Sequence, residues 1–147
     1  MKIKIKKLHP DAIIPTYSKV GDAGMDLYCV SLEKTKQGYG DFNIEYKTGI
    51  SLEIPKGYVG LIFPRSSISK SNLWLRNAVG VVDSGYRGEI ICKFGYYKGL
   101  STESAEYKKG DRIAQLLILP YPQIEFEEVD SLSETERGTG GFGSTGS

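Results

Sequence analysis

A carboxylate and an aromatic ring stand close together at a predicted turn. Asp83 and Tyr86 are separated by Ser84-Gly85, and apolar runs at 77–82 and 90–92 enter and leave this stretch. The pattern predicts a β-hairpin with a tight turn. A hairpin would hold the acid and the ring about one turn apart on a rigid frame. Such a frame can present a ligand to a water molecule that the carboxylate activates.

The stretch 64–67 carries a cation and hydroxyl groups at the end of a predicted strand. Arg65 presents a planar guanidinium, Ser66 and Ser67 present hydroxyl donors, and the turn that follows presents backbone amides. This combination suits a phosphate group. The alternative is a surface arginine beside a helix N-cap at one of the two serines.

Two further polar residues stand in apolar surroundings. Gln115 is embedded in the apolar run that follows 110–112, and Asp26 lies within the largely apolar stretch 23–28. A polar side chain in such a place must find a partner. A ligand would supply one. A structural hydrogen bond for the glutamine, and a turn or an arginine for the aspartate, would also do so, and both interpretations stay open.

The last residues, 137–147, are rich in glycine and contain Arg137 and Phe142. They carry too little apolar surface to order themselves. A linker or a fraying terminus would need neither the arginine nor the phenylalanine, whereas an arm that closes on a ligand would use both. Together with Asp83 and the cations at loop entrances, the arm indicates a triphosphate-type ligand and one carboxylate that activates water.

Short runs that alternate between apolar and polar residues dominate the rest of the chain. Glycines and prolines separate them at short intervals, which is typical of strands joined by turns. One or two helical turns are expected at 66–73. The fold class is therefore all-β, a jelly roll, barrel or sandwich with at most one short helix. The predicted strands are 2–6, 42–46, 50–54, 58–63, 79–82, 89–94, 113–119 and 124–129.

Composition narrows the function classes. The 147 residues favour one domain, and a net charge of +1 argues against nucleic acid as the main partner, because no basic excess is present to neutralise phosphates. His9 is the only histidine, which argues against a zinc site and a histidine-dependent nucleophile. Cys29 and Cys92 are expected to be buried free thiols. Without a signal peptide or an apolar run of about 18 residues, the sequence predicts a cytoplasmic protein that has no membrane partner.

Taken in order, five segments resemble the sequence motifs of the trimeric dUTP diphosphatase (deoxyuridine triphosphatase, dUTPase) family. Their order and spacing agree as well as their content, and the resemblance covers nearly the whole chain. Ser67 departs slightly from the pattern, since many members have glycine there. The segments are 23–28, 64–67, 77–88, 110–115 and 137–146.

The resemblance implies a distorted jelly roll at 1–136 that assembles as a homotrimer, with sites at the subunit interfaces. The glycine-rich arm at 137–147 would close over a site built by the other subunits. It also implies hydrolysis of dUTP to dUMP and pyrophosphate, with Mg²⁺ bound by the triphosphate. This reaction keeps uracil out of DNA and supplies dUMP for thymidylate synthesis.

The resemblance assigns roles around the predicted turn. Asp83 would deprotonate the water that attacks the α-phosphorus. Tyr86 would lie against the deoxyribose, where its ring excludes a 2′-hydroxyl. Uracil presents an N3–H donor beside an O4 acceptor and cytosine presents the reverse, so a backbone with donors and acceptors in fixed order distinguishes them. The residues expected at the base are Asn77, Gly80, Val82 and Ile91.

The remaining roles concern the phosphates, the metal and the base. Gln115 would bind phosphate or a metal-bound water, and Asp26 the latter, so no direct protein ligand to Mg²⁺ is expected. Phe142 would stack on uracil. The residues expected at the phosphates are Arg65, Ser66, Ser67, Arg137, Gly143 and Ser144.

Two other functions fit parts of the pattern. A dCTP deaminase shares the scaffold and the Pro-Arg-Ser-Ser stretch, but that family carries a glutamate where this chain has Arg87. A non-catalytic binding module would lack Asp83, Gln115 or the arm, and none of them is missing. The stretches 31–47 and 95–108 resemble variable loops, which is where a secondary protein partner would bind.

Overall fold

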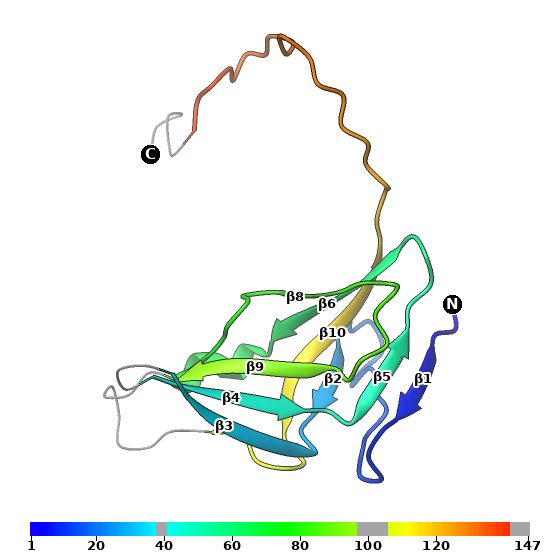
Figure 1. The fold of residues 1–147 in the computed structure, drawn as a ribbon, viewed down its shortest axis with the longest axis vertical. Helices are drawn as coiled ribbons and strands as arrows, with labels where there is room; N and C mark the ends of the chain where they lie inside the picture. The colour runs from blue at the N-terminus through cyan, green and yellow to red at the C-terminus, as the bar shows by residue number, and fades with distance from the viewer. Residues whose placement is uncertain (38–40, 97–105, 142–147) are drawn as a thin grey trace.

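The computed structural model describes residues 1–37, 41–96 and 106–141, and short antiparallel strands make up most of it (Figure 1). The strands are β1 (Lys4–Lys7), β2 (Met25–Tyr28), β3 (Ser31–Gln37), β4 (Asp41–Lys47), β5 (Ile50–Glu53), β6 (Tyr58–Pro64), β7 (Leu73–Leu75), β8 (Gly80–Val82), β9 (Ile91–Tyr96) and β10 (Arg112–Pro120). One four-stranded sheet has the order β2-β10-β6-β8, a second has the order β3-β4-β9-β7, and β1 pairs with β5.

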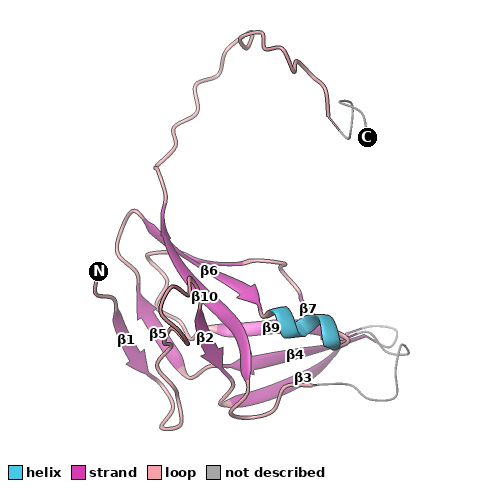
Figure 2. Cartoon of the chain, turned by 180° about the vertical axis from the view of Figure 1, so that it is seen from behind, coloured by secondary structure: helices cyan, strands magenta, loops and turns pink. Residues whose placement is uncertain are grey.

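A single turn of 3-10 helix, η1 (Ser66–Lys70), follows β6 and lies near β7 (Figure 2). It falls inside the stretch where helical turns were predicted. The all-β jelly-roll class, with at most one short helix in the described part of the chain, is therefore confirmed.

Side chains from both sheets form one hydrophobic core. In β9, Cys92 and Phe94 are buried while Ile91 and Lys93 are exposed, as the two-residue period of a strand requires. The rings of Phe94 and Tyr46 meet edge to face with centroids 5.5 Å apart. Burial of one large apolar side chain contributes roughly 1.5–3 kcal/mol, so such residues fix how the two sheets stack.

The prediction that 31–47 is a variable loop is wrong, whereas the strand predicted inside it at 42–46 is confirmed by β4. Strands β3 and β4 form an antiparallel pair in which Ser31 lies opposite Lys47 and Gln37 lies opposite Asp41. Strand β4 continues the sheet by pairing with β9. Ile44 and Tyr46 of β4 belong to the core. Strand β3 lies at the sheet edge, where 31–35 are exposed and, apart from Leu32, carry polar side chains. An edge strand of that composition looks like a loop in sequence.

The predicted hairpin around Asp83 is also wrong in its pairing. Strand β8 pairs with β6, whereas β9 pairs with β4 and β7 of the other sheet. The residues from 83 to 90 therefore cross from one sheet to the other. Alternating patterns identify strands but not their partners, so two apolar runs that flank a turn can belong to different sheets.

The strand predicted at 124–129 is absent, and the chain beyond Pro120 leaves the domain as an extended arm (Figure 1). Its apolar residues are unusually exposed: 63% for Ile124, 93% for Phe126 and 87% for Leu132. A strand needs a neighbour to satisfy its backbone groups, and this segment has no paired strand within the described chain. We name residues 121–147 the C-terminal arm.

Cys29 and Cys92 are buried and free, as predicted. Burial raises the pKa of Cys29 to about 11 and that of Cys92 to about 12, so both thiols stay protonated near neutral pH. Within the described ranges, no helix has the length and apolar character needed to span a bilayer.

Candidate active site

The first of two clefts opens where β8 meets the turn that follows it, and we call it the turn cleft. It has a volume of about 190 Å³ and is completed by Ile62 of β6 and by Glu89 and Ile90. The structure brings together here the residues assigned to the attacking water, the sugar and the base, apart from Phe142, which falls outside the described residues. These residues are Asn77, Gly80, Val82, Asp83, Tyr86 and Ile91.

A β-turn sets the spacing between Asp83 and Tyr86. The Tyr86 backbone N–H donates to the Asp83 carbonyl oxygen at 3.0 Å. Arg87 closes the same turn, because its Nη1 donates to the Ser84 carbonyl at 2.7 Å and to the Tyr86 carbonyl at 2.8 Å. Asp83 itself is exposed. A carboxylate on a braced turn with access to water meets the geometric needs of a general base.

A second tight turn places Asn77 in the turn cleft. The Val79 N–H donates to the Asn77 carbonyl at 2.5 Å, and Ala78 between them has φ +55°, which is unusual for a residue other than glycine. A Cβ at Gly80 would lie 3.1 Å from Ile62 Cβ and 3.3 Å from Asn77 Nδ2. The glycine therefore lets the β8 backbone and the Asn77 amide approach closely, as a wall that reads a base edge requires.

The second cleft, the arginine cleft, has a volume of about 340 Å³ and lies where β2, β10 and the end of β6 meet. Asp26 accepts at Oδ1 from Arg65 Nε at 3.0 Å and at Oδ2 from Arg112 Nη1 at 3.2 Å. Asp22 also lines the cleft, so two guanidiniums face two carboxylates, and it is the planar guanidinium donors rather than a net charge that suit a phosphate chain. The residues assigned from sequence that line this cleft are Asp26, Arg65, Ser66 and Gln115.

Ser67 and Gln115 are placed by their neighbours. Arg65 Nη1 reaches Ser67 Oγ at 3.5 Å, at the long limit of a hydrogen bond. Gln115 of β10 lies opposite Asp26 of β2 in the antiparallel ladder. A Cβ on Gly24 would lie 2.6 Å from Gln115 Oε1, so the absence of a side chain at Gly24 makes room for the amide.

Arg112 was missed by the sequence reasoning. A register shift between Arg112 and Ala114 in the β10–β2 ladder sets it beside Tyr28, within reach of Asp26. The signal was present, because the buried Asp26 needed a cation, and an arginine was one of the partners considered. Sequence alone does not show which arginine binds Asp26. In the structure, both Arg65 and Arg112 form salt bridges with it.

Asp26→Ala is expected to lower the free energy of unfolding by roughly 1–3 kcal/mol, measured by urea denaturation. The Asp26 side chain is only 12% exposed, and its removal leaves two guanidiniums without their acceptor. The estimate stays below that for a fully buried pair because Arg112 is 44% exposed. Glu53→Ala, which removes the exposed Lys4–Glu53 pair, is the control and should leave the midpoint unchanged. Equal midpoints for both variants would contradict the assigned role of Asp26.

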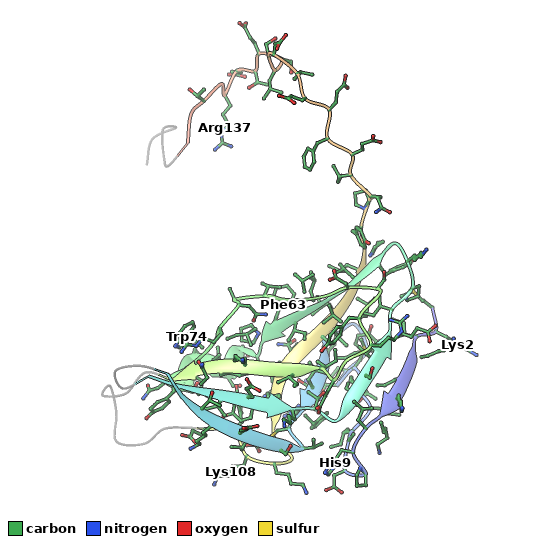
Figure 3. All side chains as sticks on the ribbon, in the orientation of Figure 1. Lys2, His9, Phe63, Trp74, Lys108 and Arg137 are labelled. Atoms are coloured by element: carbon green, nitrogen blue, oxygen red, sulfur yellow. The ribbon has the colours of Figure 1, made fainter. Side chains whose placement is uncertain are left out.

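None of the described arm residues, 121–141, lines either cleft of its own protomer. Arg137 lies on the arm away from the domain (Figure 3), where its Nε donates to the Gly140 carbonyl at 3.2 Å. Phe142, Gly143 and Ser144 fall outside the described residues. The turn cleft and the arginine cleft share no lining residue. Within one protomer the predicted site is thus in separate pieces.

Comparison with known proteins identifies the family. The dUTPase family model matches residues 10–146. The deoxyuridine 5'-triphosphate nucleotidohydrolase of Wolinella succinogenes is 45% identical over 148 aligned residues, which cover 99% of this chain and 95% of the relative.

Solved structures agree. A mutant dUTPase of Staphylococcus bacteriophage 80alpha, solved with dUpNHpp, superposes with a TM-score of 0.79 at 28% identity and 99% coverage of both chains. A mutant dUTPase from phage phi11 of S. aureus, which coordinates a structural Mg(II) ion, gives 0.70 at 25% identity and covers 89% of this chain and 98% of its own. With its motifs gathered into two clefts and its whole length matched, the chain belongs to the dUTPase family.

Proposed function

We propose that this protein hydrolyses dUTP to dUMP and pyrophosphate, with Asp83 as the general base. The observation that carries the proposal is the turn cleft, where the exposed Asp83 carboxylate stands beside an aromatic ring and a close backbone wall, while the other carboxylate, Glu89, accepts from the Gly49 N–H. The water oxygen bonds to the α-phosphorus and the carboxylate accepts its proton. The bond from the α-phosphorus to the bridging oxygen breaks, and pyrophosphate leaves.

The turn cleft would bind the nucleoside part of the substrate. The backbone of β8 and the Asn77 amide offer donors and acceptors to the uracil edge, and Gly80 allows an approach too close for the 5-methyl group of thymine. Val82 and Ile91 complete the apolar wall. Tyr86, with its ring in the same cleft, would cover the deoxyribose and exclude a 2′-hydroxyl.

The arginine cleft would bind the phosphates. Asp26 accepts a hydrogen bond from Arg65 Nε, and this bond fixes the plane of the guanidinium group. The Nη donors of Arg65 remain at the end of the side chain. Asp26 therefore orients a phosphate-binding arginine as well as balancing its charge. Ser66, Ser67 and Gln115 add donors at the same end. From the arm, Arg137, Gly143 and Ser144 would cradle the outer phosphates while Phe142 stacks on the base.

Magnesium would enter with the triphosphate. Both Asp26 oxygens accept hydrogen bonds from arginines, and the two arginines offset the charge of the two carboxylates that line this cleft, Asp22 and Asp26, so little net negative charge attracts a bare cation. The Asp26 carboxylate and the Gln115 amide fit a hydrated ion, which they would hold through its waters. When bound, the metal neutralises part of the triphosphate charge. The structural Mg(II) ion of the phage phi11 enzyme supports magnesium as the metal.

A homotrimer would join the separate pieces into complete sites. The apolar residues of the arm are exposed on their own protomer, and a cleft of about 370 Å³ lined by Ile3, Ile5 and Ile118 offers an apolar surface for them. Strand β1, with Lys4 and Lys6, pairs only with β5 within the described chain. Because the arm carries glutamates at 125 and 127, it complements that edge in charge, as in strand addition between chains.

The cytoplasmic location stays part of the proposal. It is supported by two free thiols, which are usual where disulfides do not form.

The test is pyrophosphate release with Mg²⁺ from dUTP, dCTP, dTTP and UTP, measured side by side. We expect kcat/KM for dUTP to exceed that for each of the others by at least about a hundredfold, since each competitor leaves a cleft group unpaired or meets a clash. Release of ammonia from dCTP would instead favour a deaminase. Nucleotide binding without pyrophosphate release would favour a binding module.

A further inference from the structure

Gly88 lies two residues beyond Tyr86 in the segment that crosses between the sheets. A Cβ built on Gly88 has three nearest neighbours, and all belong to the Tyr86 side chain: the hydroxyl oxygen, Cζ at 2.5 Å and Cε2 at 2.9 Å. The end of the Tyr86 side chain thus rests on the bare backbone of Gly88. Gly88 does not have a positive φ, so its backbone conformation is open to other residues. A glycine is needed at 88 because any side chain there would occupy the place of the Tyr86 ring.

The tip of the ring is held as well. The Tyr86 hydroxyl donates to the Glu89 carbonyl at 3.0 Å. Even so, Tyr86 remains 47% exposed and lines the turn cleft. The ring is therefore seated against the segment at its phenol end and open to a ligand elsewhere.

The backbone under the ring has little freedom to move. On one side of Gly88, the Arg87 carbonyl accepts from the buried Ser51 hydroxyl at 2.6 Å. On the other side, Glu89 Oε1 accepts from the Gly49 N–H at 2.7 Å. The next residue, Ile90, is joined to β5 by its N–H, which donates to the Ile50 carbonyl at 2.9 Å. Hydrogen bonds to the stretch 49–51 therefore hold the segment on both sides of Gly88.

We infer that Gly88 is a specificity-determining residue. It acts by allowing the Tyr86 ring to lie in the position from which the ring excludes a ribose. This inference rests on the proposed function, in which Tyr86 covers the sugar. Because the backbone is anchored at Arg87 and Ile90 and the Glu89 side chain is bound to Gly49, an added methyl group at 88 must displace the flexible end of the tyrosine. The ring then moves away from residue 88 and no longer fills the space that a 2′-hydroxyl would occupy.

The experiment is a double-mutant cycle of Gly88→Ala and Tyr86→Ala, with kcat/KM measured for dUTP and UTP. We expect each single variant to reduce the dUTP-over-UTP ratio by about tenfold or more, and the double variant to resemble Tyr86→Ala alone. Gly85→Ala is the matched control, since a Cβ at Gly85 meets nothing within 4 Å and Gly85 lines neither the turn cleft nor the arginine cleft. It should change the ratio less than about twofold.

Two outcomes overturn the inference: an unchanged ratio in Gly88→Ala, or an equal loss from Gly88→Ala when Tyr86 is already alanine. A crystal structure of Gly88→Ala gives a reading that does not depend on activity. We expect the ring to move while the backbone from 83 to 90 stays in place, and a seated ring over a shifted backbone would contradict this. Absence of dUTP hydrolysis in the unmodified protein would instead refute the proposed function.

Discussion

Asp83→Asn is expected to lower kcat for dUTP by roughly 10²–10⁴-fold, the usual contribution of a general base, while KM changes by only a few-fold. Asparagine keeps the size and the hydrogen-bonding capacity of the side chain, but it cannot accept the proton of the attacking water. The turn itself should persist, because it depends on the bond from the Tyr86 N–H to the residue 83 carbonyl and on Arg87.

Asp11→Asn provides the control for that variant. Asp11 is an exposed carboxylate whose pKa is lowered by its hydrogen bond and charge interaction with Lys109, and it lines neither the turn cleft nor the arginine cleft. Its kcat should match that of the unmodified protein. Near-normal turnover of Asp83→Asn would remove the assigned base from the reaction.

Truncation after Glu136 is expected to reduce kcat/KM for dUTP by roughly a hundredfold or more. The loss combines the stacking of Phe142, about 1–3 kcal/mol, with the charge-assisted hydrogen bonds of Arg137, about 1.5–3 kcal/mol. The mass of the oligomer, measured by light scattering, should not change, because the exposed apolar residues at 124–132 remain.

Glu134→Ala serves as the control for the truncation, since this exposed residue lies on the arm before the cut. Its activity should be unaltered. A truncated protein with full activity would mean that 137–147 is a linker. A truncated protein that falls apart into monomers would place the assembly contacts in the removed residues, contrary to the proposed arm exchange.

The sequence was sufficient for the parts of the site that depend on short stretches of chain. A turn between Asp83 and Tyr86 needs only the local residues, and the structure contains it. Gly80 lies in the same cleft because it begins the strand that leads into that turn, and Asn77 because it lies on the tight turn just before that strand. The all-β class likewise follows from alternation repeated along the chain.

The errors concern contacts between distant stretches. The hairpin around Asp83 was mispaired because an apolar run does not identify its partner strand. The strand at 31–37 was missed because an edge strand carries polar residues on its exposed face. The stretch 124–129 has the composition of a strand but pairs with no strand among the described residues, and the alternating pattern alone does not show that a partner is missing.

Arg112 and Gly88 were overlooked for a related reason. The role of Arg112 depends on a register shift that brings it to Asp26, and that of Gly88 depends on where the Tyr86 ring falls. Each is a three-dimensional fact about a side chain, and neither residue has an unusual sequence context.

A crystal structure of the full-length protein with Mg²⁺ and an α,β-imido analogue of dUTP tests the central claim most directly. We expect the Asp83 carboxylate of one protomer to bond a water molecule in line with the α-phosphorus, while Arg65 of a different protomer contacts the phosphates. If the carboxylate points away from the nucleotide and no such water is present, Asp83 is not the base.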